Sequence, residues 1–95
     1  MVLGKITGTI TSSTNSTGIP GGRFLLVNKC NQQGQLKNDF LVALDLVSAG
    51  NNEMVMVSQS TAARETPTTH DKAIDAVIVG IVDTIDENEK VVYKK

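Results

Sequence analysis

Few side chains in this sequence have the chemistry of an active site. Among its 95 residues there are one cysteine, one histidine, one tyrosine and two phenylalanines, and tryptophan is absent. A single cysteine excludes an internal disulfide, and one histidine leaves few ways to build a nucleophile–base pair or a metal centre. No phosphate-binding glycine motif occurs either. We therefore expect no catalytic residue, no cofactor and no metal ion.

Charge of one sign and long apolar runs are also missing. Nine basic and ten acidic residues give a net charge of -1 without a basic cluster, so nucleic acid is not an expected partner. No apolar run reaches the roughly 18 residues of a membrane span, and residues 1–6 lack the apolar region of a signal peptide. We expect a cytoplasmic protein without a membrane partner.

The sequence is rich in short β-strand patterns. Residues 2–10 alternate so that Val2, Gly4, Ile6, Gly8 and Ile10 share one face, predicted to face the core, with glycine where another backbone approaches closely. Gly34 is expected to supply a positive φ in a turn. Further strands are predicted over 23–28, 40–45, 54–57, 76–82 and 91–93, with turns over 31–38 and 86–89.

These elements predict an all-β fold. The 76–82 strand is apolar on both faces except for Gly80 and is expected to be central or packed on both sides. A short helical turn is predicted over 60–65, with Ser60 as N-cap and Pro67 preventing its extension. Five or six short strands with one helical turn favour a small, OB-like, five-stranded closed barrel. We expect one domain over residues 1–95, small enough for oligomerisation to help cover its apolar surface.

The loop Ser48–Glu53 is the main candidate site. Its small side chains would let backbone approach backbone or let identical loops surround an axis, and Gly50 and Asn51 tolerate left-handed geometry. A plain connecting turn is the open alternative. Arg64 could pair with a carboxylate such as Glu53 or Asp75, or could be a solvated surface arginine.

The remaining reactive groups favour structural interpretations. Asp45, Asp75 and Asp83 lie at strand ends, where carboxylates accept backbone hydrogen bonds. Cys30 is interpreted as an inert thiol at a strand end, and His70 as part of a solvated loop.

Several segments together resemble the EutN/CcmL family, the pentameric vertex proteins of bacterial microcompartments. The most specific is Ala62-Ala-Arg64 followed by the run Asp75–Asp83. The other matching segments are Met1–Ile10, Lys29–Leu46 and the loop Asp45–Glu53. The resemblance implies an OB-like barrel that assembles as a homopentamer, caps the vertices of a polyhedral shell in the cytoplasm, and has hexameric shell proteins as partners.

The same resemblance implies roles for individual residues. The loop at the pore, around the fivefold axis, would consist of Ser48, Ala49, Gly50, Asn51, Asn52 and Glu53. Candidate inter-subunit contacts are Arg64, Asp75 and Asp83. The family's loop usually reads Gly-Ala-Gly-x-Gly-Glu, so this chain has serine and asparagine where the family has its first and third glycines.

One alternative function is an OB-fold module that binds single-stranded nucleic acid. Such modules use a basic groove and aromatic side chains on which bases stack. This chain has three aromatic residues, two of them, Phe24 and Phe40, in strands predicted to form the core, and a slightly negative charge. The sequence favours a structural shell protein over this alternative.

Overall fold

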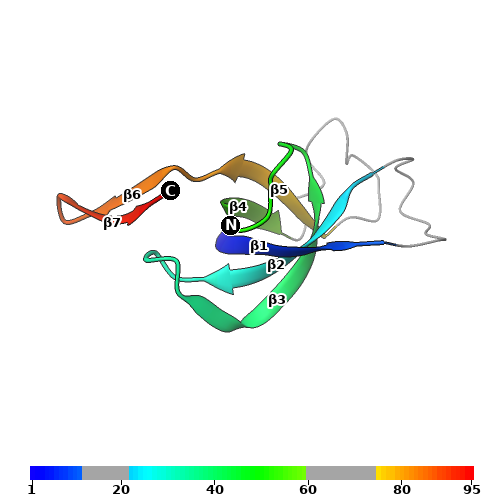
Figure 1. Cartoon of the computed structure of the whole chain (residues 1–95), viewed down its shortest axis with the longest axis horizontal. Helices are drawn as coiled ribbons and strands as arrows, with labels where there is room; N and C mark the ends of the chain where they lie inside the picture. Colours follow the sequence, from blue (N-terminus) through cyan, green and yellow to red (C-terminus); the bar gives the residue numbers. More distant parts are fainter. Residues whose placement is uncertain (12–21, 60–74) are drawn as a thin grey trace.

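The computed structural model describes residues 1–11, 22–59 and 75–95 (Figure 1). The predicted helical turn at 60–65 lies outside these ranges. Within them, no helix is long and apolar enough to cross a membrane. The described strands are β1 (Val2–Ile10), β2 (Phe24–Cys30), β3 (Leu36–Asp45), β4 (Met54–Gln59), β5 (Ala76–Ile81), β6 (Thr84–Glu87) and β7 (Lys90–Lys94).

Five of these strands close a barrel in the order β1-β2-β3-β5-β4. Every neighbouring pair is antiparallel except β3 and β5, which run parallel. The consecutive residues Val77 and Ile78 of β5 are both completely buried, which confirms that this strand is packed on both faces. The OB-like closed barrel predicted from the sequence is thereby confirmed.

The barrel interior is filled by aliphatic side chains. The two aromatic residues of the barrel strands lie outside this core. Phe24 packs against Leu44 and Val77 in a small separate cluster, and Phe40 is 63% exposed on β3. Placing Phe40 in the core from its strand position was therefore wrong. The buried core cluster consists of Ile6, Leu25, Val27, Ala43, Ala49, Val55, Val57, Ala76 and Ile78.

A β-bulge divides β1 into two halves that face in different directions. Ile6 is paired with the inward-facing Val27, but Gly8 is paired with the outward-facing Leu26, so one residue is inserted between them. Beyond this bulge the alternation changes face, and Ile10 is 41% exposed. The prediction that one face of residues 2–10 points to the core holds only up to Ile6.

The turn between β2 and β3 is shorter than predicted. Asn31 and Gln35 are joined by a backbone hydrogen bond of 3.0 Å, and β3 already begins at Leu36. Gly34 has a φ of 85°, which confirms its predicted role. A Cβ at Gly34 would lie 3.2 Å from the Tyr93 ring, so the glycine also allows β7 to approach this turn.

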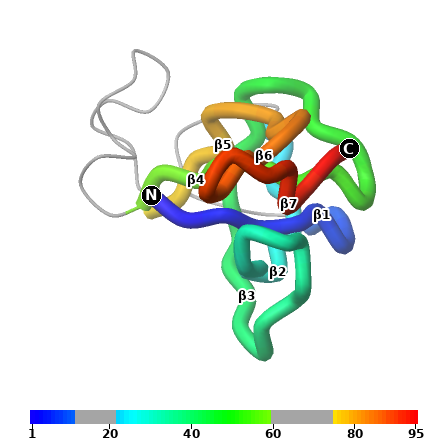
Figure 2. The backbone as a smooth tube through the Cα atoms, turned by 90° about the vertical axis from the view of Figure 1, so that its left-hand side faces the viewer, coloured from blue at the N-terminus to red at the C-terminus, as the bar shows by residue number. Residues whose placement is uncertain are grey.

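Strands β6 and β7 form a two-stranded ribbon beyond one end of the barrel (Figures 1 and 2). The sequence analysis placed a turn at 86–89, but residues 84–87 are a strand and only Asn88 and Glu89 turn. Both have positive φ, 53° and 65°, as in the type I′ turns that suit the twist of a hairpin. A hydrogen bond from Gln32 to Glu87 (3.2 Å) ties the ribbon to the β2–β3 turn.

The close approach of β1 and β2 gives a test of the barrel packing. A Cβ at Gly4 would overlap the Cγ1 atom of Val27 and lie 3.0 Å from the backbone oxygen of Asn28. We expect Gly4→Ala to lower the free energy of unfolding by roughly 1–3 kcal/mol, since backbone cannot move aside easily. Urea unfolding at a fixed protein concentration measures this.

The matched control is Gly8→Ala on the same strand. A Cβ at Gly8 would make an ordinary contact, 3.7 Å from Leu26, so its stability should change by no more than about 0.5 kcal/mol. Equal effects at the two glycines would contradict the described packing.

Candidate functional site

The loop between β3 and β4 is held at its start by the Asp45 carboxylate. This carboxylate accepts hydrogen bonds from the backbone N–H groups of Val47 (3.0 Å) and Ala49 (3.1 Å to Oδ2). Its side chain is only 2% exposed, so these bonds replace the water it has lost. The predicted role of a strand-end carboxylate as a backbone acceptor is confirmed for Asp45.

Arg23 completes this arrangement from the first residue before β2. Its Nη1 atom donates to Asp45 Oδ2 (3.0 Å) and to the backbone oxygen of Ala49 (3.1 Å). One guanidinium therefore binds both the start and the middle of the loop. The sequence analysis missed this role, although Arg23 and Asp45 bound the two strands of the predicted hairpin and would meet at its open end.

Ala49 anchors the loop in the barrel. It is completely buried and belongs to the main core cluster. The small side chain at position 49 is therefore explained by tight packing within its own chain. Ser48, Asn51 and Asn52, in contrast, are exposed, so this part of the loop presents neutral polar side chains.

The left-handed residues of the loop are not the ones expected. The prediction named Gly50 and Asn51, but the positive φ angles occur at Ser48 (58°) and Asn52 (67°). These are the two positions where the family has glycine and this chain does not. A serine in this conformation is strained, whereas asparagine tolerates it better.

Glu53 closes the loop at its other end. Its Oε1 atom accepts a hydrogen bond from the backbone N–H of Gly50 (2.5 Å), and its Oε2 atom contacts Lys95 Nζ at 2.5 Å. The hydrogen bond from Lys95, followed by that from Gly50, lowers the pKa of the Glu53 carboxyl below its usual value. Glu53 also raises the pKa of Lys95.

Backbone bonds attach the same end of the loop to β1. The N–H of Asn52 donates to the oxygen of Ile6 (2.8 Å), and the N–H of Ile6 donates to the oxygen of Glu53 (3.1 Å). The loop thus continues the β1–β4 pairing by one more residue. It is a fixed part of the barrel rim.

Two of the predicted inter-subunit residues lie at the two ends of β5. Asp75 is exposed just before β5, and Asp83 is exposed between β5 and β6. The backbone oxygen of Asp83 accepts a hydrogen bond from the N–H of Lys95 (2.8 Å). Arg64 and His70 lie outside the described residues.

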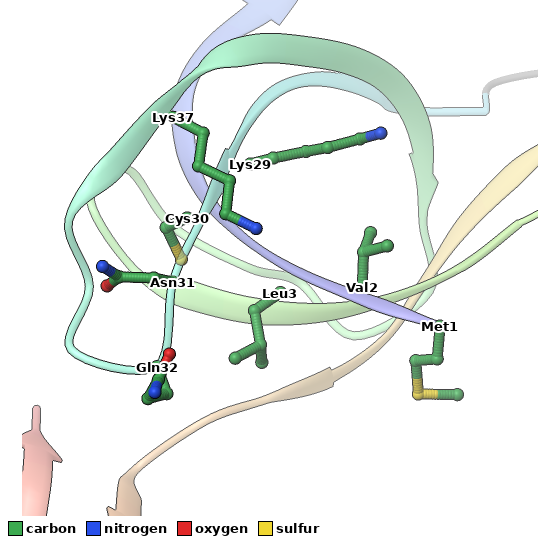
Figure 3. Close-up of a pocket in the computed structure, with 8 residues that line it drawn as sticks. All are labelled: Met1, Val2, Leu3, Lys29, Cys30, Asn31, Gln32 and Lys37. Atoms are coloured by element: carbon green, nitrogen blue, oxygen red, sulfur yellow. The ribbon is translucent and has the colours of Figure 1, made fainter.

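A cavity of about 290 Å³ lies at the surface where β1 meets the end of β2 (Figure 3). Cys30 is buried beside it, and burial raises the pKa of its thiol, opposed by Lys5 and Lys37. A thiol that holds its proton is a poor nucleophile, which supports the interpretation of Cys30 as inert. The lining residues are Met1, Val2, Leu3, Lys29, Cys30, Asn31, Gln32 and Lys37.

No metal site was found in the part of the chain that the structure describes. There, no three His, Cys, Asp or Glu side chains are grouped closely enough to hold an ion. What the described residues build is a loop held by hydrogen bonds at both ends, with the neutral polar side chains of Ser48, Asn51 and Asn52 exposed.

Comparison with known proteins identifies the family. The family model described as ethanolamine utilisation protein EutN/carboxysome matches residues 1–83. The chain belongs to the EutN/CcmL family. This confirms the resemblance drawn from the sequence. The matched range includes β1 to β5 and the 46–53 loop, whereas the β6–β7 ribbon lies beyond it.

Individual members of the EutN/CcmL family are similar over nearly their whole length. The carboxysome shell vertex protein CcmL of Thermosynechococcus vestitus is 36% identical over 95 residues, which cover all of this chain and 96% of that protein. The solved structure of Gloeobacter violaceus CcmL has a TM-score of 0.94 at 35% identity and covers all of this chain and 98% of its own.

A third comparison concerns assembly. The pentameric microcompartment shell protein GrpN from Rhodospirillum rubrum matches with a TM-score of 0.83 and 37% identity, covering 92% of this chain and 99% of its own. The resemblance therefore extends to a solved shell protein described as pentameric.

The left-handed residues of the loop give a second test. Ser48→Gly should raise the free energy of unfolding by about 0.5–1 kcal/mol. Glycine relieves the backbone strain at this position, and this gain is larger than the extra conformational entropy that glycine loses on folding. Asn52→Gly should give a smaller gain. Urea unfolding of the variants at equal concentration measures both.

The control for this test is Asn51→Gly in the same loop. Asn51 is exposed and is not among the residues with positive φ, so glycine there should lower stability by up to about 1 kcal/mol. A gain at position 51 equal to that at 48 would contradict the described backbone.

Proposed function

We propose that this protein is a structural shell protein of a bacterial microcompartment, whose homopentamers cap the vertices of the polyhedral shell in the cytoplasm. The observation that carries the proposal is the match of nearly the whole chain to solved shell vertex proteins, one of them described as pentameric. We take residues 1–95 as one domain, since relatives of almost the same length align with all of it.

An apolar surface on β1, β2 and β3 supports assembly. Exposed Ile10 and half-buried Phe24 are paired across β1 and β2, and Leu26 is paired with Val42 across β2 and β3. Phe40 and Val42, 63% and 45% exposed, extend this surface along β3. We call these five residues the β2–β3 patch. An apolar surface of this kind on a small soluble domain favours contact with another protein.

A second apolar surface lies on β4 and β5. Met56 and Val79 are 37% and 36% exposed, and the Met56 side chain lies over Gly80. We call Met56, Val79 and Gly80 the β4–β5 patch. A head-to-tail ring needs two different surfaces on each subunit, one for each neighbour. We propose that the two patches meet in the ring.

The candidate residues fit into this assembly as follows. The 48–53 loop is proposed to surround the fivefold axis, because it is rigid and presents small polar side chains. Arg64, Asp75 and Asp83 remain proposed inter-subunit contacts. Hexameric shell proteins are the proposed partners at the rim, since flat hexagonal sheets close into a polyhedron only through fivefold units.

The proposed ring is tested by placing a charge on each patch. Val42→Asp and Val79→Asp should each shift the protein from pentamer toward monomer, because an unpaired carboxylate would be buried at the interface. Both positions are partly exposed in the single chain, so the barrel itself should still fold. Native mass spectrometry gives the oligomeric state, and circular dichroism checks folding.

Val91→Asp is the matched control. Val91 is 60% exposed on the ribbon, outside both patches, and its variant should remain pentameric. A wild-type protein that is monomeric at micromolar concentration would overturn the proposed function. A ring unaffected by both patch variants would overturn the proposed interface.

We also propose that the protein acts without catalysis and without binding nucleic acid. Among the described residues, Phe40 is the only strongly exposed barrel aromatic, and the chain has a net charge of -1 without a basic cluster, so the stacking surface and basic groove of a single-strand binder are missing. Fluorescence anisotropy with single-stranded oligonucleotides should show no binding at micromolar protein. Binding that weakens with added salt would instead favour the OB-fold nucleic-acid module.

A further inference from the structure

The two ends of the 46–53 loop are fixed in different ways. At the start, Asp45 is bound by backbone N–H groups and by Arg23, all close to the loop itself. At the end, Glu53 depends on Lys95, which is 42 residues away in the sequence and follows the β6–β7 ribbon. The Glu53 side chain therefore has a partner outside the barrel, in addition to the backbone bonds that join this end of the loop to Ile6.

Each oxygen of the Glu53 carboxylate has its own partner. Oε1 accepts the Gly50 N–H, and Oε2 contacts the Lys95 ammonium. A carboxylate held at one oxygen by a cation has less freedom to rotate away from the amide at the other. The position of Lys95 thus affects how well Glu53 holds the turn at Gly50.

Lys95 is itself well placed for this contact. Its backbone N–H donates to the oxygen of Asp83 (2.8 Å), and the N–H of Val82 donates to the oxygen of Met54 (2.8 Å). The base of the ribbon and the first residue of β4 are thereby joined next to Glu53. In Figure 1 the end of the chain has returned from the tip of the ribbon to the barrel.

The contact between Lys95 and Glu53 also affects the net charge at the loop. Glu53 is the only charged side chain among residues 48–53, and Lys95 neutralises it. Five copies of the loop around an axis would then present Ser48, Asn51 and Asn52 without a ring of five uncompensated carboxylates.

We propose that Lys95 is a positioning residue for the loop: it orients the Glu53 carboxylate so that this group holds Gly50, and it cancels the loop's charge. The effect on the charge around a fivefold axis rests on the proposed function. The contact between Lys95 and Glu53 does not rest on it, because all of its groups belong to one chain.

A double-mutant cycle read by amide hydrogen exchange tests the proposal. In Lys95→Gln the Gly50 amide should exchange about 2- to 5-fold faster, the range expected for a half-exposed ion pair. In Glu53→Ala it should exchange faster still, because its acceptor is gone. Adding Lys95→Gln to Glu53→Ala should change nothing further, since Lys95 acts only through Glu53.

Two further variants separate positioning from general charge effects. Lys94→Gln removes the same charge one residue away and should leave Gly50 exchange unchanged. Lys95→Arg keeps a cation and should keep exchange within about 2-fold of the wild type. An NMR titration of the Glu53 carboxyl should show a higher pKa in Lys95→Gln than in the wild type and no change in Lys94→Gln.

The proposal is overturned if Lys95→Gln leaves Gly50 exchange unaltered, or if its effect persists in the Glu53→Ala background. It is also overturned if Lys94→Gln has the same effect. Native mass spectrometry of the same samples keeps the two proposals apart. A monomeric wild type would count against the ring, while the exchange cycle would still report on the contact.

Discussion

The nearly buried carboxylate of Asp45 is the constraint on which the rest of the loop depends. It lies where β3 ends, and two backbone amides and Arg23 donate hydrogen bonds to it in place of water. These bonds turn the chain sharply enough for Ala49 to enter the core. Two residues of the loop, Ser48 and Asn52, have left-handed backbone conformations.

The inner and outer faces of the barrel carry apolar side chains of different sizes. Short aliphatic side chains such as Val27, Val55 and Ile78 fill the inside completely, so a chain of 95 residues can close a five-stranded sheet without an aromatic core. The larger apolar side chains that remain, Phe40 and Met56 among them, are left on the outside. A subunit built in this way folds around a small interior and keeps much of its hydrophobic surface available for neighbours.

The sequence predicted what alternation and turn chemistry control. The barrel strands, the packing of β5 on both faces and the positive φ of Gly34 follow from local patterns that the structure keeps. The change of face after Ile6 was missed, because a bulge is decided by the pairing with β2. The strand at 84–87 was missed since its acidic residues resemble a turn, and only its pairing with β7 makes it a strand. The Arg23–Asp45 and Lys95–Glu53 contacts join residues far apart in the sequence, so no local sequence pattern predicts them.

The hydrogen bonds that Ile6 makes with Asn52 and Glu53 have a mechanical consequence. Ile6 is a core residue of β1, and both its N–H and its backbone oxygen are hydrogen-bonded to the end of the loop. To move outward, the loop would have to peel β4 away from β1 and admit water to the aliphatic interior. In the proposed pentamer, an opening lined by such loops would keep a constant diameter. Widening it would require partial unfolding of each domain.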